Sequence, residues 1–152
     1  MLASAKINES MLKNLTKGND MDVEIEKLMK EFPVFFDQNA GENPFKYRGL
    51  EIDIGWISLV REMVLKLEKQ AKLESRSPEK PVQCAQIKEK FGLLRCYLVN
   101  TSEAMQQIVH EFESKSAGVC ESCGAPGKLY YQVWQHVKCE ACEKKYQESG
   151  DQ

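Results

Sequence analysis

The sequence predicts an α+β fold in which helices pack with a β-hairpin and a C-terminal four-cysteine zinc ribbon follows. Apolar residues recur at helical spacing in three segments. A stretch at about 82–99 is rich in strand-forming residues around a Gly-containing turn. Two Cys-x-x-Cys pairs then flank fifteen residues at 124–138. A chain of 152 residues is long enough for one core and a small appended module.

We expect the body of the protein to span 21–117, after a polar and weakly ordered segment at 1–20. The first helix is predicted at about 22–32, and Pro33 ends it because proline disfavours the helical conformation in the preceding residue. The following stretch to Gly49 is rich in turn formers and is predicted to be a loop. The apolar stripe of this helix contains Val23, Ile25, Leu28, Met29 and Phe32.

Two further helices are predicted at about 54–74 and 101–117. Asp53 is the expected cap of the first, and Asn100, with Glu103 as its capping-box partner, is the expected cap of the second. Gly118 is expected in the left-handed conformation that ends many helices. The two buried stripes contain Trp56, Leu59, Val60, Met63, Val64 and Leu67, and Met105, Ile108, Val109 and Phe112.

Between these helices, strands at 82–87 and 93–99 are predicted to form the hairpin, with "KEKFG" as its loop. Gly92 can adopt a positive φ there. A loop centred near Lys90 would place Cys84 and Cys96 opposite one another. The pair is interpreted either as a redox couple or as two small buried apolar residues. A reducing compartment favours the second interpretation.

The two Cys-x-x-Cys pairs indicate a ribbon at 118–146 that binds Zn²⁺ through four thiolates: Cys120, Cys123, Cys139 and Cys142. Four protein ligands leave no open position for substrate, so the ion is expected to be structural. Two alternatives to the zinc ribbon are a thioredoxin-like redox site and an iron–sulfur site. The redox site would need a single Cys-x-x-Cys pair within a βαβ unit, which the sequence does not show. His136 is expected to be a strand residue near the knuckle, and His110 to lie on an exposed helix face.

Composition and motifs narrow the function classes. The chain has no 18-residue apolar run and no secretory signal pattern, so we expect a cytoplasmic protein with no membrane segment. A net charge of −2 disfavours a protein devoted to nucleic-acid binding. Catalytic patterns such as Gly-x-Ser-x-Gly, His-Glu-x-x-His or a phosphate-binding glycine loop do not occur, so an enzyme is not expected.

Four segments, "LMKEFPVFFDQ", "GLEIDIGWISLVREM", "VQCAQIKEKFGLLRCYL" and "CESCGAPGKL…VKCEACEKK", occur in that order. In these the chain resembles a group of small, largely uncharacterised bacterial and phage-encoded proteins, over about residues 24–145. The group tends to carry a Gly-Asp-Gly-Trp turn where this chain reads Ile-Asp-Ile-Gly-Trp at 52–56. The resemblance implies a shared fold and an origin in a phage or mobile element, and it implies no activity.

The resulting hypothesis is a non-enzymatic phage-type protein that binds and modulates a host protein in the host cytoplasm. Its more specific form is inhibition of a host defence or nucleic-acid-processing complex. The alternative is a nucleic-acid-binding zinc ribbon, in which aromatic residues would stack on bases. The candidate interaction residues lie in the hairpin and the ribbon: Lys88, Lys90, Phe91, Arg95, Tyr130, Tyr131 and Trp134.

Overall fold

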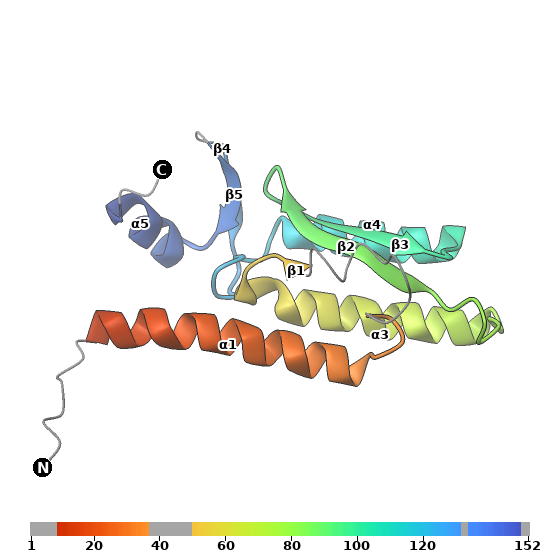
Figure 1. The fold of residues 1–152 in the computed structure, drawn as a ribbon. Helices are drawn as coiled ribbons and strands as arrows, with labels where there is room; N and C mark the ends of the chain where they lie inside the picture. Colours follow the sequence, from red (N-terminus) through yellow and green to blue (C-terminus); the bar gives the residue numbers. More distant parts are fainter. Residues whose placement is uncertain (1–8, 37–49, 132–133, 150–152) are drawn as a thin grey trace, which may run out of the picture.

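The computed structural model of the chain describes residues 9–36, 50–131 and 134–149. It confirms the predicted α+β class. Helix α1 (Glu9–Glu31) runs alongside α3 (Ile57–Leu73). The hairpin formed by β2 (Gln83–Lys90) and β3 (Leu93–Val99) lies along α4 (Glu103–Ser116), with its turn toward the ribbon at one end of the molecule (Figure 1). None of the described helices is both long and apolar enough to cross a membrane.

Helix α1 begins at Glu9, earlier than the predicted start near residue 22. The sequence suggested a separate N-terminal segment because residues 1–20 are polar and show no strong apolar periodicity. That stretch also contains Gly18, a poor helix former. A glycine in a helix interior costs only about 1 kcal/mol, however, and no proline interrupts residues 9–31. The residues expected to be a weak helix therefore join the amphipathic segment in one continuous helix.

The connection into α3 contains two short elements. Strand β1 (Leu50–Glu51) pairs in parallel with Ile87 and Lys88 of β2 and so extends the sheet by one strand. A strand of two residues is too short to be recognised in the sequence. The 3-10 helix η1 (Ile54–Trp56) follows. The side chain of Asp53 accepts a hydrogen bond from the backbone N–H of Ile54, so Asp53 caps η1. The long helix α3 begins only at Ile57, and its N-cap, Trp56, makes no side-chain capping hydrogen bond.

The hairpin turn is shorter than predicted, with only Phe91 and Gly92 between the strands. Both have positive φ, 53° and 84°, as in a two-residue type I′ turn. Because the turn centres between Phe91 and Gly92, Cys96 pairs with Ile87, and Cys84 pairs with Leu98 beyond a β-bulge. The expectation that the two cysteines face each other directly was therefore wrong.

Helix α4 (Glu103–Ser116) is capped by Ser102, whose Oγ accepts a hydrogen bond from the N–H of Met105. The prediction of Asn100 as the cap was wrong; Asn100 has a φ of 59° and lies in the turn before the helix. Gly118 is also not left-handed: the helix ends at Ala117 in a right-handed conformation, and the N–H of Gly118 bonds to Lys115.

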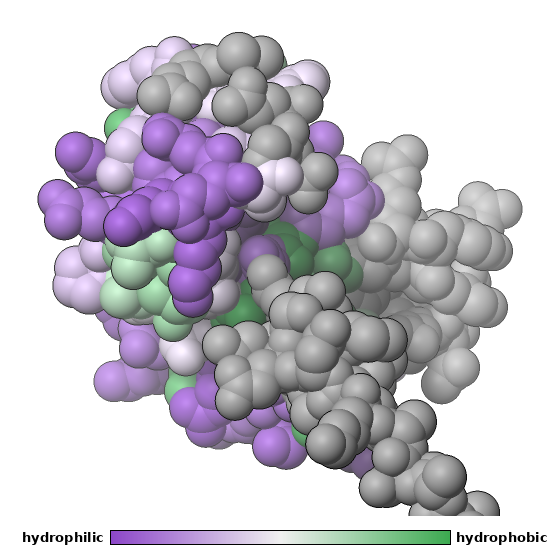
Figure 2. Space-filling model, turned by 90° about the vertical axis from the view of Figure 1, so that its left-hand side faces the viewer, coloured by the Kyte–Doolittle hydropathy of each residue, from purple (hydrophilic) through white to green (hydrophobic). Residues whose placement is uncertain are grey.

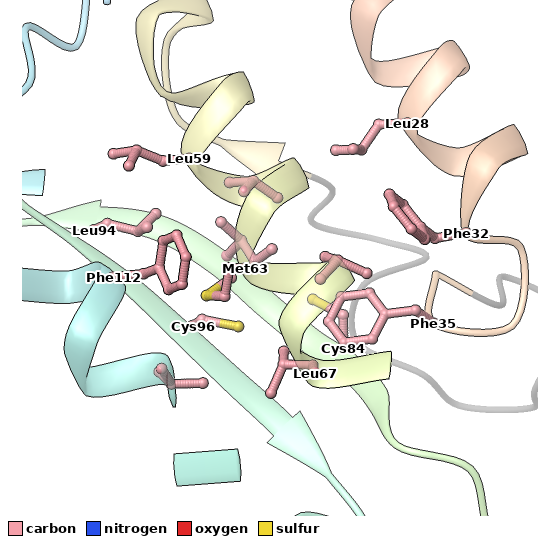
Figure 3. Close-up of a cluster of buried hydrophobic side chains, with 14 of the residues drawn as sticks. Leu28, Phe32, Phe35, Leu59, Met63, Leu67, Cys84, Leu94, Cys96 and Phe112 are labelled. Atoms are coloured by element: carbon pink, nitrogen blue, oxygen red, sulfur yellow. The ribbon is translucent and has the colours of Figure 1, made fainter. Parts of the chain in front are cut away.

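One hydrophobic core joins the helices to the sheet (Figure 3). Phe32 and Phe35 enter it beside α3, while Phe112 enters from α4. Cys84 and Cys96 are both buried there, at 0% and 6% exposure, and all six cysteines are free thiols. The core continues into the ribbon, because Val137 belongs to the same cluster.

The ribbon consists of β4 (Lys128–Tyr131), β5 (Gln135–Lys138) and α5 (Glu140–Glu148). The two strands pair antiparallel, with Leu129 opposite Val137. Helix α5 was not predicted, because the segment has few apolar residues to indicate an amphipathic helix. It starts directly after Cys139, so it positions the second cysteine pair.

Candidate metal centre

The first cysteine pair lies in a tight knuckle. After Cys120 the chain turns so that the N–H of Gly124 bonds to the carbonyl of Cys120 at 2.8 Å. The N–H of Cys120 in turn bonds to the carbonyl of Ala125, also at 2.8 Å. Gly124 has a φ of 82°, a left-handed conformation that a glycine adopts without steric cost. The knuckle therefore brings the thiol of Cys123 back beside that of Cys120.

The second pair lies at the start of α5. Cys139 is the N-cap of this helix, and its Sγ accepts a hydrogen bond from the N–H of Cys142 at 3.4 Å. Because Cys142 lies in the first helical turn, its side chain returns toward Cys139. Strand β5 leads directly into Cys139, so the ribbon hairpin sets the position of this pair relative to the knuckle.

The four Sγ atoms of Cys120, Cys123, Cys139 and Cys142 lie within 4.8 Å of one another. Cys123 and Cys139 are 3.7 Å apart at sulfur, far beyond the roughly 2.05 Å of a disulfide. A tetrahedral zinc site with Zn–S bonds of about 2.3 Å has sulfur–sulfur edges of about 3.8 Å. The four predicted ligands thus lie together as a candidate metal site, whose thiol donors suit Zn²⁺ and whose Cys123–Cys139 distance is close to that tetrahedral edge.

The thiols differ in acidity. Burial acts to raise the pKa of Cys120, but hydrogen bonds from the backbone N–H groups of Cys139, Cys123 and Ser122 outweigh it and lower the pKa to about 7. At Cys142, burial and the neighbouring cysteine sulfurs raise the pKa to about 12. Metal ligation requires the thiolate forms, so a bound cation would stabilise the ionised thiols and lower the pKa values that the neighbouring sulfurs raise.

The knuckle is fixed to the body through the Gly-Trp sequence before α3. The N–H of Gly55 donates to the carbonyl of Glu121 at 2.7 Å, and the indole Nε1–H of Trp56 donates to the carbonyl of Val119 at 2.8 Å. A Cβ at Gly55 would overlap the carbonyl oxygens of Cys120 and Glu121. Sequence reasoning placed Trp56 in the helix core and missed its role as an anchor for the metal knuckle.

The turn of the β2–β3 hairpin is a second anchor. A Cβ at Gly92 would lie 2.5 Å from Cδ1 of Leu129 and 3.2 Å from the backbone carbon of Gln135. The turn backbone therefore packs directly on the ribbon strands. The ribbon is held from two sides, by the start of α3 and by the hairpin turn.

His136 does not join the cysteine cluster, in agreement with its expected place on a strand. Its Nε2 lies 2.5 Å from Oε2 of Glu143, and its Nδ1 lies 2.8 Å from the carbonyl oxygen of Trp134. Glu143 is 4% exposed and also accepts a hydrogen bond from Gln147. This pair ties α5 to β5. Apart from its place directly after Cys142, nothing in the sequence pointed to Glu143.

The candidate interaction residues separate into two groups. Phe91, Tyr131 and Trp134 are 68%, 75% and 66% exposed. Tyr130 is partly buried, stacked on His136 with ring centroids 5.6 Å apart. Arg95 forms a 2.8 Å ion pair with Glu113 of α4.

Phe91, Lys90 and Trp134 line one cleft of about 470 Å³ between the hairpin turn and the ribbon. The structure thus brings together one aromatic from each hairpin. Seen from the end that carries α5, the described surface is mostly hydrophilic, with smaller hydrophobic areas among the charged side chains (Figure 2).

Comparison of the chain with protein-family models, curated proteins and solved structures finds no match. The cysteine cluster and the surfaces around it are therefore the features of this chain that bear on its function.

Proposed function

We propose that this chain is a non-enzymatic zinc-ribbon protein that docks on another protein through the surface shared by its two hairpins. Zinc has a structural role in this proposal: four thiolates complete a tetrahedral shell and leave no position for water or substrate. The ion would hold the ribbon hairpin beside the turn of β2 and β3.

The observation that carries the proposal is the conformation of Phe91. This residue has a φ of 53° and a side chain that is 68% exposed. The first central position of a type I′ turn favours Asn, Asp or Gly, and a bulky residue there is strained. A large apolar ring kept in a strained and exposed position supports a role in contact with a partner.

Three other aromatic residues are exposed on the same two hairpins. Among the described residues, the exposed aromatic side chains are Phe91, Tyr97, Tyr131 and Trp134, and all four belong to the two hairpins. Aromatic residues are enriched in the buried centres of protein–protein interfaces, where they contribute much of the affinity.

The resemblance of the hairpin and ribbon sequences to phage-encoded proteins motivates the identity of the partner. We propose that the chain acts in the cytoplasm of a bacterial host and modulates a host protein. Inhibition of a host defence or nucleic-acid-processing complex is the specific form of this proposal.

The test is a pull-down from bacterial lysate with the zinc-loaded full chain. Wild type is expected to retain a host protein, and the double variant Lys88→Glu with Lys90→Glu, as well as Phe91→Asn, is expected to lose it. Lys69→Glu with Lys80→Glu, at exposed positions away from the turn, is the matched control for charge. Retention of the same protein by all variants, or by none including wild type, contradicts the proposal.

Nucleic-acid binding is the second candidate, and lysines beside aromatic rings favour it. The Nζ atoms of Lys88 and Lys128 lie 5.9 and 5.2 Å from the ring centroids of Tyr97 and Tyr130, an arrangement suited to base stacking next to phosphate. Against it, residues 118–152 carry four lysines and five carboxylates. Salt-dependent binding of a labelled oligonucleotide at low micromolar protein would favour this candidate.

A further inference from the structure

The outer edge of β3 presents backbone hydrogen-bonding groups away from the sheet. The sheet order is β1-β2-β3, so among the described residues β2 is the only strand paired with β3. In a two-residue hairpin the pair next to the turn, here Lys90 and Leu93, is hydrogen-bonded. Hydrogen-bonded pairs alternate along an antiparallel ladder, so Leu94, Cys96 and Leu98 direct their N–H and C=O groups away from β2.

Two hydrogen bonds agree with this alternation. The N–H of Leu94 donates outward to Oγ of Ser116, at 3.0 Å. On β2, Cys84 pairs with Leu98 and gives its own N–H to Phe35 rather than to β3. Within residues 9–36, 50–131 and 134–149, no acceptor is found for the outward N–H of Cys96 or Leu98.

A groove of about 410 Å³ lies along this edge, between β3 and α4. Its walls come from the strand and hairpin turn on one side and from the helix on the other. The polar side chains that line it are Lys90, Arg95, Tyr97, Gln106, His110 and Glu113. An extended chain fits such a groove because its backbone can continue the ladder while alternate side chains face the two walls.

The charges of the groove favour an acidic occupant. Glu113 is already engaged: its Oε2 lies 2.8 Å from the Arg95 guanidinium, and its Oε1 lies 3.3 Å from Nδ1 of His110. Lys90 at the end of the groove, and Lys88 next to it on the same face of β2, have no described carboxylate within ion-pair distance. The turn end of the groove therefore carries unpaired positive charge.

We propose that an extended acidic segment of a partner protein adds to the edge of β3 as a further strand. Its backbone would pair with Cys96 and Leu98, and its carboxylates would face Lys88 and Lys90. This inference deepens the proposed docking function and rests on it, since it specifies the chemistry of the segment that the partner inserts.

The test uses the zinc-loaded, ¹⁵N-labelled full chain and the peptide acetyl-Glu-Val-Glu-Val-Glu-Val-amide, whose glutamates share one face when extended. Addition of the peptide is expected to shift the amide signals of Cys96 and Leu98 and to slow their hydrogen exchange at least tenfold. The same peptide with lysine for glutamate, and one N-methylated at alternate residues, are expected to bind at least tenfold more weakly.

Variants of the protein make the test specific. Lys88→Glu with Lys90→Glu is expected to weaken peptide binding at least tenfold. Leu98→Pro removes an outward N–H without removing a β2–β3 hydrogen bond, and is expected to abolish binding. Its fold is checked by the dispersion of its amide spectrum; if it does not fold, the N-methylated peptide tests the same hydrogen bond.

The inference is overturned if the N-methylated peptide binds equally well, or if the amide shifts are confined to other residues. It is also overturned if the shifts of Cys96 and Leu98 appear without peptide and depend on protein concentration, which would indicate pairing with a second copy of the chain. Displacement of the bound peptide by an oligonucleotide would overturn it as well. Failure here is distinguishable from failure of the proposed function. If folded Leu98→Pro captures the host protein as wild type does, the proposed docking function is supported and the site at the edge of β3 is ruled out. If the peptide binds at β3 but no host protein is captured, the site at the edge of β3 is supported and the proposed function is ruled out.

Discussion

The backbone N–H of Gly55 lies 2.7 Å from the carbonyl oxygen of Glu121, inside the first Cys-x-x-Cys pair. This hydrogen bond joins the start of α3 to the metal knuckle across 66 positions of the sequence, counted from 55 to 121. It makes the knuckle part of the body of the protein instead of an independent appendage.

Gly55→Ala is expected to destabilise the protein by about 3 kcal/mol, because the added methyl group overlaps two carbonyl oxygens and displaces a buried hydrogen bond. Chemical denaturation gives the free energy of unfolding, and a chromogenic chelator gives the rate of zinc release, which is expected to rise. Gly118→Ala is the matched control, since the nearest atom to its Cβ is 3.7 Å away. A similar change in stability for both variants would contradict the anchoring role of Gly55.

Elemental analysis of the purified protein is expected to show one zinc per chain. Free zinc at about a thousandfold above its Kd stabilises the bound state by about 4 kcal/mol, so removal by chelator is expected to lower the Tm by about 8–16 °C. Restored zinc should recover the Tm, and magnesium should not, because thiolates select the softer ion. A metal-free protein with an unchanged Tm would show that the cluster needs no ion.

Zinc binding is expected to release at least two protons per ion at pH 7. Burial and the neighbouring sulfurs raise the pKa of Cys142 to about 12. The pKa of Cys123 is also raised: the backbone hydrogen bond at Ala125 lowers it, but burial and the thiols of Cys120 and Cys139 together outweigh that effect. Both are thus protonated before the metal binds.

Because a raised pKa keeps a ligand protonated to higher pH, zinc affinity should increase as the pH rises and fall as it drops. Calorimetry in buffers of different ionisation enthalpy counts the protons. Release of fewer than two would mean that the thiols are already ionised in the metal-free protein.

Phe91→Asn is expected to raise the free energy of unfolding by about 0.5–1 kcal/mol, because asparagine is more readily left-handed than phenylalanine. Thermal denaturation measures this effect. Phe91→Ala is the control: it removes the ring but leaves a residue that also resists positive φ, and should bring no such gain. A loss of stability in Phe91→Asn equal to that in Phe91→Ala would indicate that the ring itself supports the fold.

Cys84 and Cys96 are expected to react slowly with alkylating reagents in the native protein. Burial, the largest influence, raises the pKa of Cys84 well above its ordinary value, with Cys96 adding to the effect, so little thiolate forms. Mass spectrometry after timed alkylation, with unfolded protein as the reference, tests this. Fast native labelling, or a disulfide between the two, would restore the redox interpretation.

The sequence was most informative where a pattern depends on neighbouring residues alone. Helical periodicity predicted the buried stripe around Trp56, and turn chemistry predicted the hairpin turn at Gly92. Metal-ligand spacing predicted the two Cys-x-x-Cys pairs that begin at Cys120 and Cys139. The α+β class and the cysteine cluster could therefore be predicted.

Features that depend on distant residues could not be predicted. Nothing local to Gly55 shows that Glu121 accepts its N–H, and nothing local to Glu143 shows that His136 lies beside it. The cap of α4 was misassigned because Asn100 and Ser102 are both good capping residues. Only the left-handed backbone at Asn100 distinguishes them.

The anchors of the metal knuckle also impose an order on biosynthesis. Gly55, Trp56 and Gly92 all leave the ribosome before Cys120 does, so the seat for the knuckle is translated before its ligands. Until the segment from Val119 to His136 emerges, the indole of Trp56 and the tip of the hairpin lack their ribbon contacts. A bound ion would thus be captured after these anchors are synthesised, and metal-starved cells should accumulate chains whose central segments are abnormally susceptible to proteases.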